Sequence, residues 1–250
     1  FTANATVTMD LSNWTNISNL TTSMYYTFGN MPNLETLNLT GWDLSNVASW
    51  QSVFYGTGKA STGCTFILPN LTLTTCTVFN DTFNGANINT IDVSNWTLKT
   101  SGVSIQNMFY SANSKTGGTW TLDLSTWNNT SGITSMYQPW RACSDMTHLN
   151  LTNWDTSNVT TMGLLCYQCT NLTHITGLSS LSAASLTGAT CIYLSFAYCS
   201  NLDFNAGATT NWGSNWGPNL GNVTNFSQMF SQVGYVTPCT GPPEVGNWDM

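Results

Sequence analysis

Two histidines and a recurring set of acidic and amide side chains have the clearest chemical potential in this 250-residue chain. His148 and His174 are separated by about the step at which the sequence repeats itself, so we expect neighbouring imidazoles that respond to acid together. The acidic and amide residues share one sequence context, at Asp10, Asn38, Asp92, Asp123 and Asn150. In a row they could hold Ca²⁺ or sugar hydroxyls. A polar row on a solvated sheet face also needs no ligand.

Catalytic motifs find little support in the sequence. The G-x-S-x-G elbow, HExxH and a phosphate-binding glycine loop are absent. Paired acids for glycoside cleavage would have to be Asp92 and Asp123, and a repeated structural position explains those two more simply. We therefore expect a non-enzymatic protein without a cofactor, calcium being the one candidate ion.

The eight cysteines favour structural roles. Cys166 and Cys169 form a C-x-x-C, but neither a second pair nor a histidine at zinc-finger spacing accompanies them, so we expect no metal site. Core packing and disulfides both remain open. Cys143, Cys169 and Cys199 share one repeat position and could form a thiol ladder, whereas Cys64 and Cys76 could pair locally.

Charge and hydropathy exclude some partners. Four Lys and Arg stand against 11 Asp and Glu, which gives a net charge of −7. Such an acidic chain is unsuited to nucleic acid or an anionic membrane. No apolar run approaches the roughly 20 residues that span a bilayer, so we expect no membrane insertion.

N-glycosylation sequons (N-x-S/T) are frequent, which favours an extracellular setting. A repeat rich in Asn and Thr also contains N-x-T by chance. They include those that begin at Asn4, Asn13, Asn38, Asn70, Asn80, Asn95, Asn150, Asn158, Asn171 and Asn222.

Internal repeats organise the whole chain. The most regular copy is LNLTNWDTSNVTTMGLLCYQCTNL from Leu149, and its frame recurs from Leu37, Ile91 and Leu122. A third copy places Pro69 where the others have tryptophan, and the pattern weakens after Leu172. We expect residues 1–250 to form a single repeat solenoid of about eight repeats. Because the last residues reopen the motif, we also expect a segment of a longer chain.

One repeat predicts a strand, a turn and a helical return. Leu149 and Leu151 alternate with polar residues, as in a half-buried strand. Val159, Met162 and Leu165 have the spacing of a short helix. The predicted fold class is therefore α/β, a solenoid with a parallel β-sheet on one face and short helices or helical turns on the other.

Tryptophan recurs at one repeat position, at Trp14, Trp42, Trp96, Trp127 and Trp154. These side chains predict a buried structural spine. An exposed aromatic ladder for sugars is the alternative.

The motif around Trp154 resembles the leucine-rich repeats of the BspA-like family, which also occur in mycoplasma surface lipoproteins. The matching residues are Leu149, Leu151, Trp154, Asp155, Ser157, Asn158, Val159, Met162, Cys169, Asn171 and Leu172. The resemblance implies a leucine-rich-repeat solenoid displayed on a cell surface and used for adhesion. The steps near 30 residues depart from the family's repeat of 25.

The resulting functional hypothesis is an extracellular, surface-displayed protein that binds a protein or glycan on another cell or matrix. Binding would use the sheet face or the insertions at residues 56–65 and 111–119. The alternative is a structural subunit of an extracellular assembly, such as a virion fibre or a surface filament, in which the chain contacts copies of itself.

Overall fold

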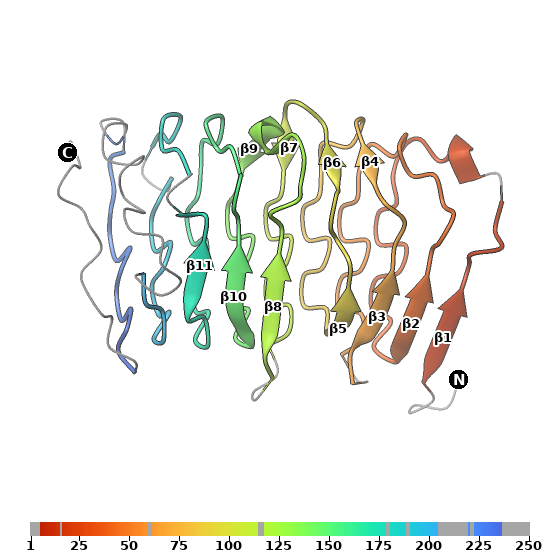
Figure 1. Cartoon of the computed structure of the whole chain (residues 1–250), viewed down its shortest axis with the longest axis horizontal. Coiled ribbons are helices and arrows are strands. Elements are labelled where there is room, and N and C mark those ends of the chain that lie inside the picture. Colours follow the sequence, from red (N-terminus) through yellow and green to blue (C-terminus); the bar gives the residue numbers. More distant parts are fainter. Residues whose placement is uncertain are drawn as a thin grey trace.

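The computed structural model is an elongated parallel β-solenoid in which residues 7–10 and residues 223–236 lie at opposite ends (Figure 1). It describes residues 6–15, 17–59, 62–114, 118–178, 181–188, 191–204, 220 and 223–236. We call each turn of the solenoid a rung. The principal strand of successive rungs is β1 (Val7–Asp10), β2 (Leu34–Asn38), β3 (Cys64–Ile67), β5 (Ile88–Ile91), β8 (Trp120–Asp123), β10 (Met146–Asn150) and β11 (His174–Thr176).

These strands form two parallel sheets, ordered β1-β2-β3-β5 and β8-β10-β11. Leu37 pairs with Phe66 and Leu149 with Ile175, so apolar side chains stay on the inner face from rung to rung. Leu149 and Leu151 are fully buried, as the alternation predicts. Shorter ladders lie after the principal strands, joining β4 (Thr72–Leu73) to β6 (Thr97–Leu98) and β7 (Val103–Ser104) to β9 (Ile133–Ser135).

The prediction of helices on the return side was wrong. The helices among the described residues are two single 3₁₀ turns, η1 (Ile17–Asn19) and η2 (Thr130–Gly132). In the most regular rung, alternate N–H groups donate to the next rung instead of closing i→i−4 bonds. The donors are Met162, Leu164, Cys166 and Gln168, and the acceptors are the carbonyls of Cys191, Tyr193, Ser195 and Ala197. Tyr167 and Cys169 close short turns onto Leu164 and Cys166.

Left-handed residues are the physical reason for this return. Two positions four residues apart have positive φ in rung after rung, and an α-helix cannot pass through them. The first position is occupied by Tyr26, Ser52, Asp81, Asn107, Gln138, Leu164, Leu194 and Gln228, and the second by Asn30, Gly56, Gly85, Ser111, Ala142, Gln168, Tyr198 and Gln232. The spacing of Met162 and Leu165 therefore reflects a chain of turns that buries the same residues.

The tryptophans stack across rungs. Trp96 and Trp127 have ring centroids 5.5 Å apart, and Trp127 and Trp154 5.6 Å. Trp14 stacks on Trp42 at 6.1 Å but is 59% exposed at the end of the solenoid. The strand register corrects one assignment. Leu71, and not Pro69, stands at the tryptophan position of the third rung, since Leu37 pairs with Phe66 and Thr72 with Thr97.

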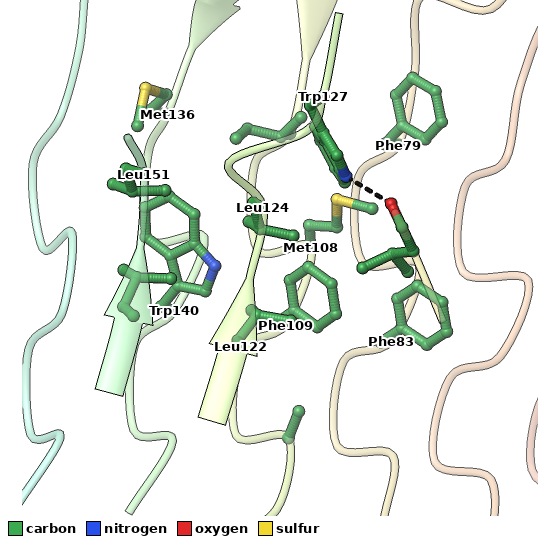
Figure 2. Packing of buried hydrophobic residues seen from close by; sticks show 14 of the residues in the cluster. Phe79, Phe83, Met108, Phe109, Leu122, Leu124, Trp127, Met136, Trp140 and Leu151 are labelled. Atoms are coloured by element: carbon green, nitrogen blue, oxygen red, sulfur yellow. Dashed lines mark hydrogen bonds between the residues drawn. The ribbon is translucent and has the colours of Figure 1, made fainter. Parts of the chain in front are cut away.

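Three of the stacked indoles, those of Trp42, Trp127 and Trp154, also donate a hydrogen bond to the preceding rung. Trp127 donates its Nε1–H to the carbonyl of Val93 at 2.8 Å, the dashed line in Figure 2. Trp42 does the same to Leu11 at 2.9 Å. A second aromatic column lies beside the tryptophans, where Phe83 stacks on Phe109 with centroids 5.0 Å apart (Figure 2). Ring stacking and a satisfied buried carbonyl together join neighbouring rungs.

The described cysteines are buried thiols and none is paired in a disulfide, so the suggested Cys64–Cys76 bridge is not formed; Cys239 lies outside the described residues. Cys143, Cys169 and Cys199 do form a ladder. Each thiol donates to a carbonyl of the preceding rung, of Phe109, Trp140 and Cys166 respectively, at 2.9 Å. Burial raises the pKa of Cys64 and Cys76 to about 12, as expected for packing thiols.

Candidate functional site

The outward side of the principal strands carries two rows of polar residues, which we call the sheet face. Asp10 is in register with Asn38, and Asp123 with Asn150. Beside them run a threonine row that includes Thr36 and its register partners Thr8 and Thr65, and, on the second sheet, Thr121, His148 and His174. Ile67 interrupts the acidic row, because it pairs with Asn38 in β3.

Each acidic or amide residue of the row caps its own strand. The Oδ1 atoms of Asp10, Asp92 and Asp123 accept the N–H of the serine two residues later at 2.8–3.0 Å. Asn38 and Asn150 accept both the N–H and the hydroxyl of the following threonine. These are Asx turns, which turn the chain out of the strand. The repeated carboxylate or amide therefore has a structural reason to recur.

The same hydrogen bonds lower the pKa values of the carboxyl groups in the row. The Ser12 hydroxyl and N–H lower the pKa of Asp10, and those of Ser94 lower the pKa of Asp92. For Asp123, burial acts in the opposite direction, but hydrogen bonds from Ser125 and Asn150, with nearby His148, give a net lowered pKa. The row is thus anionic at neutral pH and accepts hydrogen bonds.

The two histidines are stacked on adjacent strands with ring centroids 4.0 Å apart. His148 Nε2 lies 2.9 Å from the Thr176 hydroxyl, and His174 Nδ1 lies 2.9 Å from the Thr173 hydroxyl. Burial, followed by the charge of His174, lowers the pKa of His148, while Asp123 opposes the shift. Protonation of His148 beside a charged His174 is disfavoured, so the His148 ring is neutral near pH 7.

The most distinctive feature of the sheet face is a break between β5 and β8. No main-chain hydrogen bond joins these two described strands, and Figure 1 shows them farther apart than other neighbours in the row. Two hollows of about 470 and 400 Å³ occupy the break and share Asn89, Thr119 and Trp120. They form one groove, which we call the seam. Asp92 and Asp123 line one part of it, and Asp145 lines the other.

Both ends of the seam are closed by side chains. At the amino end of β5, Asn113 takes the place of a neighbouring strand, since its Oδ1 accepts the Ile88 N–H at 2.6 Å and its Nδ2 donates to the Ile88 carbonyl at 3.0 Å. Beyond the carboxyl end, Asn95 donates its N–H to the Thr126 hydroxyl at 3.0 Å. The return side of the same two rungs remains bonded, for example from Phe109 to Pro139. The opening is therefore local to the strands.

Asp145 is a functional candidate that the sequence reasoning missed. It is 4% exposed, one carboxylate oxygen lies against Gly118, and Oδ1 has no hydrogen-bond partner. Burial raises the pKa of this carboxyl group. A β-carbon at Gly118 would lie 2.7 Å from the second oxygen, so only glycine allows this approach.

A signal for Asp145 was present in the repeat. Asp145 comes directly before the buried Met146, and asparagine has the same place in other rungs, where Asn33, Asn87 and Asn171 precede the buried Leu34, Ile88 and Leu172. The carbonyl oxygens of Asn33, Asn87 and Asp145 accept equivalent hydrogen bonds, from Val7, Cys64 and Trp120. An aspartate at a position where other rungs have asparagine, in the rung that follows the insertion at 111–119, is therefore the sequence signal for Asp145.

Calcium finds limited support at the predicted row. Within the described residues, no group of three or more His, Cys, Asp and Glu side chains is placed to hold a metal ion. The nearest arrangement is a carboxylate beside an amide, Asp10 with Asn38 and Asp123 with Asn150.

The sequon asparagines differ in accessibility. Asn13, Asn70, Asn95 and Asn158 are exposed, whereas Asn38, Asn80, Asn150 and Asn171 are half-buried. Asn4 and Asn222 lie outside the described residues. The amides of Asn38 and Asn150 are engaged in Asx turns, which makes them poorer attachment points than Asn70 or Asn158.

Comparison with known proteins gives one match. The family model described as "Mycoplasma protein of unknown function, DUF285" matches residues 1–96, 22–121 and 77–212. No curated protein and no solved structure matches the chain. Among the described residues, no helix is long and apolar enough to cross a membrane.

Proposed function

We propose, since the chain belongs to the DUF285 family of mycoplasma proteins of unknown function, that it is an extracellular, surface-displayed solenoid that binds a protein or glycan. The binding surface is the sheet face, including the seam. The resemblance of the repeat around Trp154 to BspA-like leucine-rich repeats supports display and adhesion, and the exposed sequons at Asn70, Asn95 and Asn158 agree with an extracellular setting.

One observation carries the proposal. The outward side chains lie in register across rungs as fixed hydrogen-bond acceptors, with Asp123 beside Asn150 and both held by their own Asx turns. Acceptors that are already oriented lose little conformational freedom when a ligand binds. Their lowered pKa values suit recognition of hydroxyl, amide or cationic donors and are unsuited to general acid catalysis.

A binding survey tests this function. The purified chain is applied to a glycan array and to a panel of extracellular matrix proteins, together with a variant that combines Thr36→Arg and Thr121→Arg. These substitutions place bulky cations on both sheets of the face. Gln51→Ala, on the exposed return side, is the matched control.

We expect at least one ligand that the wild type and Gln51→Ala bind and the double variant does not. Equal binding by all three proteins would place the binding surface elsewhere. No binding, accompanied by concentration-dependent filaments or ordered oligomers, would favour the alternative of a structural subunit in an extracellular assembly.

A further inference from the structure

We propose that the seam between β5 and β8 receives an extended, lysine- or arginine-bearing peptide strand of a partner protein, which completes the sheet by β-augmentation. This inference rests on the proposed binding function and specifies its partner. The occupant is a strand because, among the principal strands that the structure describes, the row is interrupted at one place, between two strands that run in the same direction (Figure 1).

Each wall of the seam offers backbone groups. β5 is bonded only to β3, and β8 only to β10, so both keep one edge without a main-chain neighbour. In regular rungs Leu39 and Leu151 donate their N–H groups to the next rung, to the carbonyls of Ile67 and Thr176. Val93 has the equivalent position and makes no such bond to the rung of β8. Unpaired strand edges are the sites at which extended peptides add to a sheet.

The charge of the groove specifies the side chains of the occupant. Asp92, Asp123 and Asp145 line it, and among the described lining residues there is no Lys, Arg or His. Asp145 is at the position before Met146, which pairs with Trp120, so it is level with Thr119, and Asp123 is four residues farther along β8. The carboxylates therefore face two points about 13 Å apart along a strand. Basic residues at two outward positions of an inserted strand would meet both.

Asp145 adds an independent reason for a ligand. Its Oδ1 is buried without a hydrogen-bond partner on the wall of the groove, and a carboxylate in that state is costly unless a donor reaches it. An ammonium or guanidinium group entering the seam supplies that donor. A neutral glycan would satisfy the acceptors but not the charge.

The probe is a labelled peptide based on the chain itself. It has the sequence of residues 119–126 with Thr119→Lys and Asp123→Lys, and blocked ends. In parallel register its two lysines fall beside Asp145 and between Asp92 and Asp123, while the positions of Leu122 and Leu124 face inward. Two control peptides separate the contribution of the lysine charges from that of main-chain hydrogen bonding. One carries glutamate in place of both lysines, and the other keeps both lysines but has alternate main-chain nitrogens methylated.

Binding is measured by fluorescence anisotropy to the full chain and to three variants. Asp145→Asn and Asp123→Asn test the seam, and asparagine is native at both equivalent positions in other rungs, at Asn171 and Asn150. Asp10→Asn is the matched control, in the same acidic row but outside the seam. Thermal melts check that each variant is folded.

We expect the lysine peptide to bind the wild type and Asp10→Asn alike, and each seam variant to bind it about tenfold more weakly or worse. The glutamate and N-methylated peptides should not bind. The inference is overturned if the lysine peptide does not bind, if the N-methylated peptide binds equally, or if Asp10→Asn weakens binding as much as Asp145→Asn. Glycan or matrix-protein binding without peptide binding would reject the strand site and leave the proposed function standing.

Discussion

The indole N–H of Trp154 donates to the main-chain carbonyl of Leu124 at 2.8 Å, across the boundary between two rungs. The same ring stacks on Trp127, whose own N–H reaches back to Val93. Trp127 and Trp154 therefore each fill the core and satisfy a buried acceptor of the preceding rung. This double role explains why the residue recurs without any contribution from a ligand.

Trp154→Phe should destabilise the protein by about 2–3 kcal/mol, because the buried carbonyl of Leu124 loses its donor and part of the stacked area is lost. Trp14→Phe, at the exposed end of the stack, should change the stability by no more than about 0.5 kcal/mol. Urea unfolding followed by far-UV circular dichroism measures both. Equal effects of the two substitutions would show that neither the hydrogen bond nor the buried stacking area of Trp154 stabilises the rungs.

Ala142→Gly should stabilise the protein by about 0.5–1 kcal/mol, because Ala142 has a φ of 57° at a position where Gly56 and Gly85 are native. The reverse change, Gly85→Ala, should cost about the same. Chemical unfolding of the two variants against the wild type gives the comparison. If Ala142→Gly is destabilising, the left-handed conformation of the return turns is incorrect.

Asp145→Asn should raise the stability at neutral pH by on the order of 1 kcal/mol, because it removes a buried carboxylate with an unpaired oxygen. The pKa of Asp145 is higher in the folded protein than in the unfolded chain. As the pH falls between these two pKa values, the folded state binds more protons than the unfolded chain, so the stability rises above its value at neutral pH. The advantage of the variant should disappear over the same interval. Thermal melts from pH 7 to pH 4 check it, and a constant difference would argue against the raised pKa.

Acid should also weaken the protein through the histidine pair. The folded-state pKa of His148 lies below the ordinary histidine value of about 6.5, so the unfolded chain takes up its proton first and stability falls as the pH drops below about 6.5. His174→Gln removes the neighbouring positive charge and should make the decline shallower. NMR titration of the two imidazoles, with melts over the same range, tests the coupling. Independent titration at ordinary pKa values would contradict it.

Sequence periodicity predicted the solenoid and the alternation of its strands. Leu149 and Leu151 face the core, and Asn38 and Asn150 face outward, because a side-chain period of two leaves one choice of buried face. The recurrence of Trp127 and Trp154 predicted neighbours in space, and the structure places those rings in a stack.

The return segments and the seam were not predictable in the same way. Met162 and Leu165 are buried whether the backbone is helical or turns through left-handed residues, and Leu164, Gln168 and their equivalents share no side-chain type that signals positive φ. The seam depends on two particular residues, Asn113 and Asp145, whose contacts form only when neighbouring rungs are assembled. A pattern averaged over repeats conceals both.

Amide hydrogen exchange on the full chain tests most directly whether the sheet is open between β5 and β8. We predict that the Val93 amide exchanges at least about a hundredfold faster than the equivalent amides of Leu39 and Leu151, and that the lysine peptide restores its protection. Equal protection of the three amides without peptide would mean that β5 and β8 are paired, and it would contradict both the seam and the strand site.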